Sequence, residues 1–339
     1  MAQETLVSFD LMPLIASFQD GIHHNMLPLV QERSDTVVQI FHAWINVHGD
    51  AWLVRLRACL PRLNCVILKH AVIFGHCDRI DTFEMNEFSD NLLQEAASAG
   101  QLQVIQHLLD KKYTAGIANA MEAAASNGHL RVVEFLHRHR SDRQTSRVMN
   151  AAAAAGHLDV VRFLHFHRSE GCTTAAIDNA AANGHLHVVK FLFKYRDEGY
   201  TRSAIHLAAG NGHVDVVKWF VEKRGERWTS MTINNAAASG HLAVLAYLHG
   251  RNSRMGWTKR AMDIAATNGH LNVVKFFWDN HRLGCSTQAL EGARRNGHAS
   301  VVDFLERHSQ EMIHSLCCAC GFIKPLGHAC SQMPSLCKA

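Results

Sequence analysis

One pattern recurs at nearly constant spacing along the chain, and it constrains the fold more than any other feature. The pattern is Ala-Ala-x-x-Gly-His-Leu-x-Val-Val-x-Phe-Leu, and its glycines follow each other every 28 residues, with a single spacing of 29. These glycines are Gly100, Gly128, Gly156, Gly184, Gly212, Gly240, Gly269 and Gly297. A ninth, degenerate copy is predicted at Gly75-His76. The repetition predicts a solenoid, because so short a unit can bury its apolar face only against neighbouring units.

Each copy is predicted to form two short helices that meet at the glycine. In the fourth copy, Thr173 is predicted to cap the first helix, because its hydroxyl can accept a hydrogen bond from an unpaired backbone N–H. Gly184 is predicted to end this helix in left-handed backbone, which penalises any residue with a Cβ. Leu186, Val189 and Leu192 then recur three residues apart, as in the apolar stripe of a second helix.

Two further columns follow the same period. A hydroxyl stands eleven residues before the glycine and is predicted to cap the first helix in Thr145, Thr173, Thr201, Thr229, Thr258 and Ser286. Paired alanines are predicted to let neighbouring helices approach closely: Ala123-Ala124, Ala151-Ala152, Ala180-Ala181, Ala208-Ala209, Ala236-Ala237 and Ala265-Ala266. No proline interrupts residues 62–324, so the helices are predicted to be unbroken.

The array over residues 65–308 resembles ankyrin repeats. The segment Ser203-Ala204-Ile205-His206-Leu207-Ala208-Ala209-Gly210-Asn211-Gly212-His213 is similar to the family run T-P-L-H-x-A-A-x-x-G-H. The period of 28 is shorter than the usual 33 and is similar to that of ankyrin families in oomycetes and giant viruses. With the helices complete, the missing residues are expected in the β-turn fingers. The resemblance implies an all-α solenoid of ankyrin-like repeats with shortened or absent fingers.

Two end regions flank the predicted array. Residues 1–64 are expected to form an irregular helical cap, with an F-box-like ubiquitin-ligase adaptor, suggested by Leu27-Pro28 and Trp44, as the alternative. Residues 309–339 are expected to form a flexible tail of reduced thiols, with a zinc-binding or redox-responsive tail as the alternative. The tail cysteines are Cys317, Cys318, Cys320, Cys330 and Cys337.

Histidine is abundant, with 25 residues, but its placement does not predict a metal site. The residues that follow the repeat glycines are His76, His129, His157, His185, His213, His241, His270 and His298. Stacked helices lie roughly 8–10 Å apart, and zinc needs its nitrogens about 2 Å away, so this column is predicted to bond local backbone beside the turn. The pairs His137/His139 and His165/His167 lie two residues apart and are expected to be solvated groups at helix ends.

Composition and motifs narrow the function. The sequence has no phosphate-binding loop, nucleophile elbow or H-E-x-x-H motif, so we expect neither catalysis nor a cofactor. A net charge of +4 and interleaved acidic residues make nucleic acid a weaker expectation than protein. Basic residues after the second helices are expected to be solvated. No apolar run reaches membrane-spanning length and the N-terminus lacks a basic leader, which predicts the cytoplasm, with the nucleus as the alternative.

Partner contacts are predicted in the column that precedes the capping hydroxyl. It contains Tyr200, Trp228 and Trp257, and tyrosine and tryptophan are enriched in binding hot spots. Arg202 and Arg260 add a basic rim. The alternative is that each ring packs over the loop of the next repeat. The sequence therefore predicts a monomeric scaffold or adaptor that binds a protein partner and no small-molecule substrate.

Overall fold

The computed structural model describes residues 18–19, 22–23, 37–59, 63–84, 91–114, 116–139, 146–252, 254–281 and 286–308. Within these residues the only strands are β1 (Phe18–Gln19) and β2 (Ile22–His23), an antiparallel pair with Phe18 opposite His23. All other described elements are helices, which confirms the all-α repeat prediction. The chain divides into two compact units, Met1–Thr201 and Arg202–Ala339.

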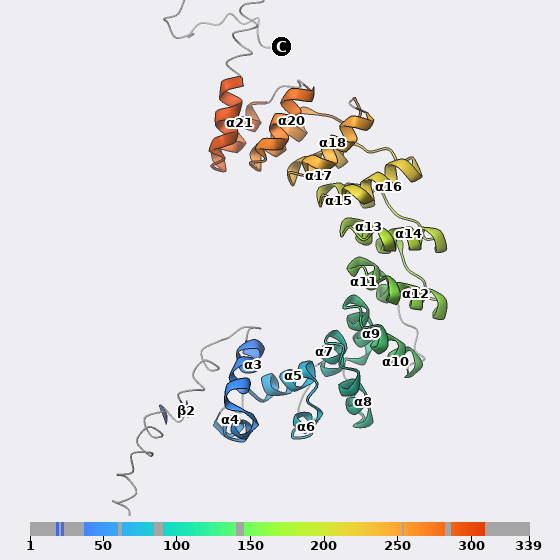
Figure 1. The fold of residues 1–339 in the computed structure, drawn as a ribbon, viewed down its shortest axis with the longest axis vertical. Helices are drawn as coiled ribbons and strands as arrows, with labels where there is room; N and C mark the ends of the chain where they lie inside the picture. The colour runs from blue at the N-terminus through green and yellow to red at the C-terminus, as the bar shows by residue number, and fades with distance from the viewer. Residues whose placement is uncertain are drawn as a thin grey trace, which may run out of the picture. The chain divides into compact units, whose positions relative to one another are not determined.

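The first unit begins with a few irregular helices and continues as helix pairs. Its elements are α3 (Val37–His48), the 3-10 helix η2 (Asp50–Trp52), α4 (Leu53–Cys59), α5 (Asn64–Phe74), α6 (Cys77–Ile80), α7 (Leu92–Ser98), α8 (Leu102–Asp110), α9 (Ile117–Ser126), α10 (Leu130–His139), α11 (Arg147–Ala155), α12 (Leu158–His167), α13 (Thr174–Ala182) and α14 (Leu186–Tyr195). The first helices α7, α9, α11 and α13 pack in one row, and the second helices α8, α10, α12 and α14 pack in another (Figure 1).

The second unit repeats this two-row arrangement. Its elements are α15 (Ser203–Gly210), α16 (Val214–Arg224), α17 (Ser230–Ala238), α18 (Leu242–Arg251), α19 (Lys259–Thr267), α20 (Leu271–His281), α21 (Thr287–Arg295) and the helical residues 299–308. First helices pack in the order α15, α17, α19 and α21, and second helices in the order α16, α18 and α20. The loops at 196–202 and 225–229 form no strand, as predicted for shortened fingers.

The turn between the two helices of a repeat is built as the sequence predicts. Gly184 has φ +79°, in the left-handed region. The backbone N–H of His185 then donates to Ala180 O at 2.8 Å, and that of Gly184 donates to Ala181 O at 3.2 Å. These two bonds satisfy carbonyls that the end of a helix otherwise leaves unpaired.

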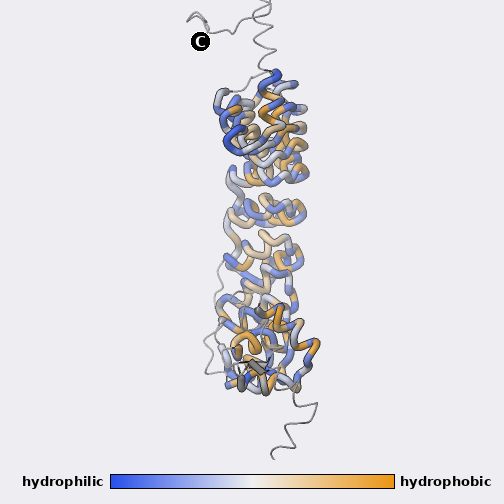
Figure 2. Tube along the Cα trace, turned by 90° about the vertical axis from the view of Figure 1, so that its left-hand side faces the viewer, coloured by the Kyte–Doolittle hydropathy of each residue, from blue (hydrophilic) through white to orange (hydrophobic). Residues whose placement is uncertain are grey.

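In each unit the core is a layer between the two rows of helices. In the fourth copy, Ala180 and Ala181 face Val188, Val189 and Leu192 within one repeat, and all five are fully buried. Each buried valine or leucine contributes about 1.5–3 kcal/mol through removal of its side chain from water. Hydrophobic and hydrophilic residues accordingly alternate along the tube of Figure 2 and do not gather in one part of it.

Two of the predicted alanine pairs are off by one residue. In α9 and α11 the fully buried pairs are Ala124-Ala125 and Ala152-Ala153, whereas Ala123 and Ala151 are half-exposed. In the later repeats the buried pairs are the predicted ones, such as Ala236-Ala237. The error arose because α9 and α11 contain longer runs of alanine. In such a run, only the distance from the glycine identifies the pair that faces the core.

The degenerate upstream copy is present as α5 and α6. Gly75 has φ +85° and ends α5 in the same left-handed turn. Further upstream, Trp44 is only 6% exposed and lies against Phe41, with ring centroids 6.1 Å apart. Trp44 is therefore a core residue of this region. The Leu27-Pro28 pair and the cysteine tail lie outside the described residues.

Candidate interaction surface

The repeat histidines form a joint between neighbouring repeats. The ring of His129 packs on Gly100 of the preceding repeat, where an added Cβ would lie 2.6 Å from its Nδ1. Its Nε2 donates to Ser98 O at 2.9 Å, and His270 Nε2 donates in the same way to Ala238 O. The prediction that these histidines bond local backbone is therefore wrong for His129 and His270. The rings of His157, His185, His241 and His298 likewise reach back to the glycine of the preceding repeat. The glycines are thus constrained twice, by their φ angle and by the ring that covers them.

Asparagines beside the turn strengthen this joint. Asn183 Nδ2 donates to Ala154 O at 2.7 Å, and Asn268 Nδ2 donates to Ala238 O at 2.7 Å. In the first full repeat, where glutamine replaces histidine after Gly100, Gln101 Nε2 donates to Ile73 O at 2.8 Å. Each bond satisfies a carbonyl near the end of the preceding first helix. The asparagine of the recurring Asn-Gly-His run was the sequence signal for these contacts.

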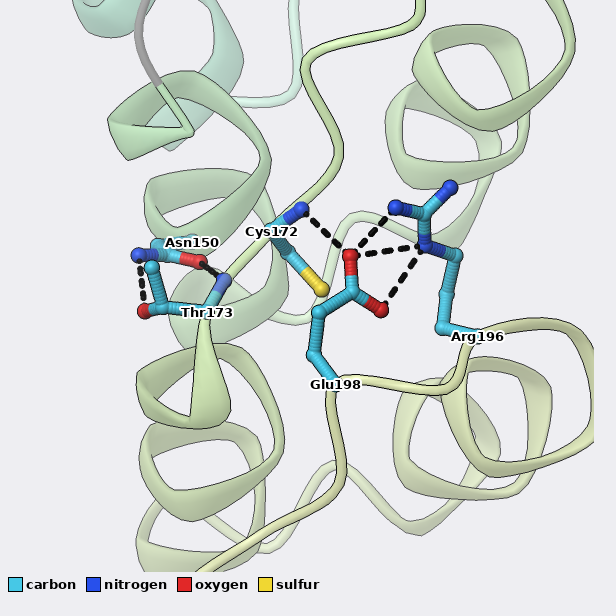
Figure 3. A network of polar contacts seen from close by, with 5 residues as sticks. All are labelled: Asn150, Cys172, Thr173, Arg196 and Glu198. Atoms are coloured by element: carbon cyan, nitrogen blue, oxygen red, sulfur yellow. Dashed lines mark hydrogen bonds and ion pairs between the residues drawn. The ribbon is translucent and has the colours of Figure 1, made fainter.

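A second joint connects the capping hydroxyls with the preceding first helix. Thr201 donates its N–H and its hydroxyl to the two carboxylate oxygens of Asp178, at 2.8 and 2.7 Å. Ser286 makes the same pair of bonds to Asp263, at 3.1 and 2.8 Å. Thr173 donates its N–H to Asn150 Oδ1 at 3.0 Å, but its hydroxyl accepts a hydrogen bond from Asn150 Nδ2 at 2.8 Å (Figure 3). Thr173 and Ser286 also accept the predicted cap bonds, from Ala175 N and Gln288 N. The cap prediction is wrong for Thr201, because the N-cap of α15 is Arg202, and for Thr258, which accepts no cap bond; Thr145 lies outside the described residues.

The third joint is an ion pair in the loop between repeats. Arg196 binds Glu198, and Glu198 Oε1 also accepts the N–H of Cys172 from the preceding loop at 3.1 Å (Figure 3). Hydrogen bonds from Arg196 lower the pKa of Glu198 to about 2, and burial raises the pKa of Cys172 to about 11. The Arg168 side chain is only 10% exposed and binds Glu170. The sequence predicted that these two arginines would be solvated at helix ends. That prediction is wrong, because both are engaged in ion pairs.

The cap joint is interrupted at one repeat of the second unit. Asn234 occupies the position equivalent to Asp178 and Asp263, but its Oδ1 is buried without a hydrogen-bond partner, as is the hydroxyl oxygen of Thr258. The two residues are 24 apart, whereas the paired residues are 23 apart, because the single 29-residue spacing falls here. The extra residue moves the hydroxyl out of reach of its partner.

The joints hold the first helices of the first unit side by side, and a polar groove runs across α7, α9 and α11. Its volume is about 440 Å³. The residues that line it are Gln94, Glu95, Ser98, Asn119, Glu122, Ala123, Ser126, Asn127, Arg147 and Ala151. Ala123 and Ala151, the two alanines that the core does not bury, are among these lining residues.

The groove offers hydrogen-bonding groups and an excess of negative charge. Glu122 forms an ion pair with Arg147 across the groove, with N–O distances of 3.2 and 3.3 Å. Glu95, one repeat earlier, forms no ion pair among the described residues. The amide of Asn127 donates to Ala123 O at 2.9 Å. Amides, hydroxyls and a free carboxylate together suit an extended peptide with a basic side chain.

The aromatic residues predicted as partner contacts differ in their surroundings. Trp228 is 7% exposed, and its Nε1 donates to Met255 O in the next loop at 3.2 Å, which favours the packing alternative for this ring. Trp257 is half-buried and stacks on His281, with centroids 3.9 Å apart. Tyr200, in the first unit, lies 6.4 Å from the Phe193 ring.

The predicted basic rim is accessible. Arg202 stands at the start of α15 and Arg260 in α19, and both are exposed. The predicted contact residues are divided between the units: Tyr200 belongs to the first, and the second contains Arg202, Trp228, Trp257 and Arg260. Among the described residues, no ring contact joins Trp228 to Trp257.

The phenylalanine of the recurring pattern forms an aromatic column along the second helices. Seven residues after the glycine stand Phe135, Phe163, Phe191, Trp219, Tyr247, Phe276 and Phe304. His137 meets the Phe163 ring edge-on at 5.5 Å, and His165 meets Phe191 at 5.6 Å. The Nδ1–H groups of His139 and His167 donate hydrogen bonds to the carbonyl oxygens of Phe135 and Phe163, four residues earlier. The expectation of solvated groups at helix ends is therefore confirmed for His139 and His167, which are exposed, and is wrong for His137 and His165, which are half-buried against rings.

Histidines also pair with one another at two places. His42 Nδ1 lies 3.0 Å from His70 Nε2 in the first unit, and His249 Nδ1 lies 3.1 Å from His281 Nε2 in the second. His70 is 1% exposed; burial, then Arg79 and His42, lower its pKa to about 4. Burial and His249 likewise lower the pKa of His281 to about 4. Each pair is held by a hydrogen bond between nitrogens of the two rings.

We expect acidification to destabilise the protein between about pH 6.5 and pH 4. In this range the unfolded chain binds protons that folded His70 and His281 do not bind. Each such histidine lowers the free energy of unfolding by up to about 1.4 kcal/mol per pH unit as the pH falls. Urea unfolding at a series of pH values measures the slope.

The His70→Gln and His281→Gln variants, whose amides do not titrate, should each show a shallower slope in that range. The Glu198 carboxylate serves as an internal contrast, because its lowered pKa makes its stabilisation disappear only below about pH 4.5. A slope that is unchanged in both glutamine variants would contradict the assignment.

The geometry defines a helical-repeat solenoid, and comparison with known proteins agrees. The model of the family described as ankyrin repeats, in three copies, matches residues 93–174 and again residues 148–232. No curated protein matches the chain significantly. Turn glycines and joints continue the matched register as far as Gly297. Residues 93–232 are therefore ankyrin repeats, with a period shortened to 28 residues.

Ankyrin repeats mediate protein–protein interactions, and their fold is typically non-catalytic. None of the helices in the described ranges is both long enough and apolar enough to cross a lipid bilayer.

Proposed function

We propose that this protein is a non-enzymatic scaffold or adaptor that binds an extended segment of a partner protein in the groove across α7, α9 and α11. The observation that carries the proposal is the lining of that groove, in which amides, hydroxyls and carboxylates come from three successive repeats. A partner that crosses several repeats gains many small contacts from one rigid surface, so little entropy is lost on the protein side.

Charge specifies one feature of the segment. Glu95 is available for a lysine or arginine of the partner, whereas Glu122 is already paired with Arg147. The Asn127 and Asn119 amides are exposed and can bond to the peptide backbone. The groove therefore favours a polar segment with one basic anchor. The exposed Arg202 and Arg260 are proposed as additional contacts in the second unit.

Affinity capture from extracts of the source cells tests this proposal. We expect Glu95→Lys to reduce the recovery of wild-type partners by about tenfold or more, because it places like charge against the basic anchor. Quantitative mass spectrometry of the captured proteins provides the measurement. Circular dichroism confirms that the variant retains its helices.

A matched pair of substitutions isolates the groove from general charge effects. Glu122 and Glu291 stand at the same distance before their repeat glycines, and only Glu122 lines the groove. Glu122→Lys should reduce capture, whereas Glu291→Lys should leave it unchanged. Equal capture by wild type, Glu95→Lys and Glu122→Lys would remove the groove as the binding site.

A further inference from the structure

The second helices of the first unit carry a surface distinct from the groove. Phe166, in α12, is 63% exposed, the most exposed aromatic side chain among the described residues. Its ring contacts only that of His165, its sequence neighbour, within those residues. Tyr195, at the end of α14, is 45% exposed. A large apolar ring at such a position makes little contribution to folding.

Phe166 departs from the repeat pattern. The same position, ten residues after the glycine, holds Arg138 in α10 and Lys194 in α14, and in the second unit it holds Glu222 and Asp279. The second helix α18 has a glycine at this position. In all the full repeats other than these two, the second helix has a charged residue there. The array therefore tolerates charge here, and packing does not require phenylalanine.

Four cations surround Phe166. Arg162 lies one turn earlier on α12, and Lys190 occupies the equivalent position on α14; both are exposed and neither forms an ion pair among the described residues. Arg138, on α10, is 3.9 Å from Glu134, and Lys194 Nζ lies 5.0 Å from the Tyr195 ring centroid. All four belong to neighbouring helices of one packed row.

The acidic residues on this face are few and partly engaged. Glu134 is paired with Arg138, and the Asp159 carboxylate accepts the N–H of Val160 at 2.9 Å. The face therefore has a net positive charge around an exposed ring. Opposite charge on a partner would steer its approach, and the ring would provide a desolvated anchor.

We propose that Phe166, Tyr195, Arg138, Arg162, Lys190 and Lys194 form a docking surface, the outer patch, for an acidic protein segment that places a hydrophobic side chain on Phe166. Single-stranded nucleic acid fits this face less well, because it needs successive open rings for its bases. Here the neighbouring rings of Phe135 and Phe163 are covered by His139 and His167, at 3.9 and 4.4 Å. The outer patch and the groove use opposite rows of helices, so one chain can hold two partners of opposite charge.

Selection from a displayed library of short random peptides against the full chain tests the outer patch. We expect enriched peptides to combine Asp or Glu with an aromatic or aliphatic residue. Fluorescence anisotropy with labelled copies of these peptides should show about tenfold weaker binding to Phe166→Ala and to Arg162→Glu/Lys190→Glu. Binding should also weaken as salt rises, because the charges are exposed.

The second unit provides the matched control. Lys218 and Lys275 occupy the repeat position of Arg162 and Lys190, but Glu222 and Asp279 stand there in place of Phe166. Lys218→Glu/Lys275→Glu should therefore leave peptide binding unchanged. Thermal melts establish that all variants are folded.

Three results would overturn the proposal. The first is that the library yields no binders, or only binders without acidic residues. The second is that the binders bind equally well to wild type and to the Phe166 and Arg162/Lys190 variants. The third is that oligouridine or phosphatidylserine vesicles, in place of the peptides, bind the wild type and lose binding in those variants. The last result would reassign the same surface to nucleic acid or membrane. Failure of the groove variants to affect capture bears on the proposed function alone.

Discussion

The Gly212→Val variant should lose about 4 kcal/mol of folding free energy, from two separate causes. Gly212 has φ +80°, a backbone conformation that a β-branched residue rarely adopts. In addition, a Cβ at this position would lie 2.6 Å from His241 Nδ1, so the ring of the joint has to move. Urea unfolding followed by circular dichroism provides the measurement.

Two other glycines of the second unit separate these causes. Gly225 has φ +66° with open space around its Cβ position, so Gly225→Val should cost only the backbone part, about 1–2 kcal/mol. Gly250 lies within α18 at ordinary helical φ with no close neighbour, so Gly250→Ala should stabilise by up to about 1 kcal/mol. Adding His241→Ala to Gly212→Val should recover part of the loss. A loss in Gly212→Val no larger than that in Gly225→Val would show that the histidine joint contributes nothing.

Trp228→Ala is expected to cost about 4 kcal/mol, because it removes a large ring that is 7% exposed. Trp228→Phe should cost only about 1 kcal/mol, since it keeps most of the ring and loses the bond from Nε1 to Met255 O. Thermal or urea unfolding measures both. Partner capture by folded Trp228→Phe should equal that of wild type. An alanine variant of wild-type stability that no longer captures partners would show that the ring is a contact residue.

Much of the array could be predicted from local pattern. The spacing of Gly184, Leu186, Val189 and Leu192 identifies the turn and the stripe directly, because these features depend on residues within a few positions of each other. The capping role of Thr173 was predicted for the same reason, and the bond from Ala175 N to its hydroxyl confirms it. Fold class and family followed from the register of these residues.

The joints could not be predicted because they depend on how repeats stack. His129 was predicted to bond near its own turn, yet its carbonyl partner, Ser98, lies 31 residues earlier. The sequence shows that a histidine recurs at the position of His129. Which carbonyl its ring contacts depends on the rotation between repeats. The same limitation applies to Glu95 and Arg147, which reach one groove from α7 and α11. Phe166, by contrast, could have been found in the sequence as a break in a charged column.

The joints also determine how a chain of this kind can change in length. His-to-carbonyl and Asp-to-hydroxyl contacts, and the contact of Glu198 with the backbone N–H of Cys172, all connect a residue with a partner close to one period away, so each repeat carries one half of every joint on either side. Tandem duplication of a 28-residue segment, begun at any point within the regular part, would supply both halves at each new boundary. Insertion of a single residue does not, as the unpaired Asn234 and Thr258 illustrate. Genes for such arrays are therefore expected to grow and shrink in whole periods.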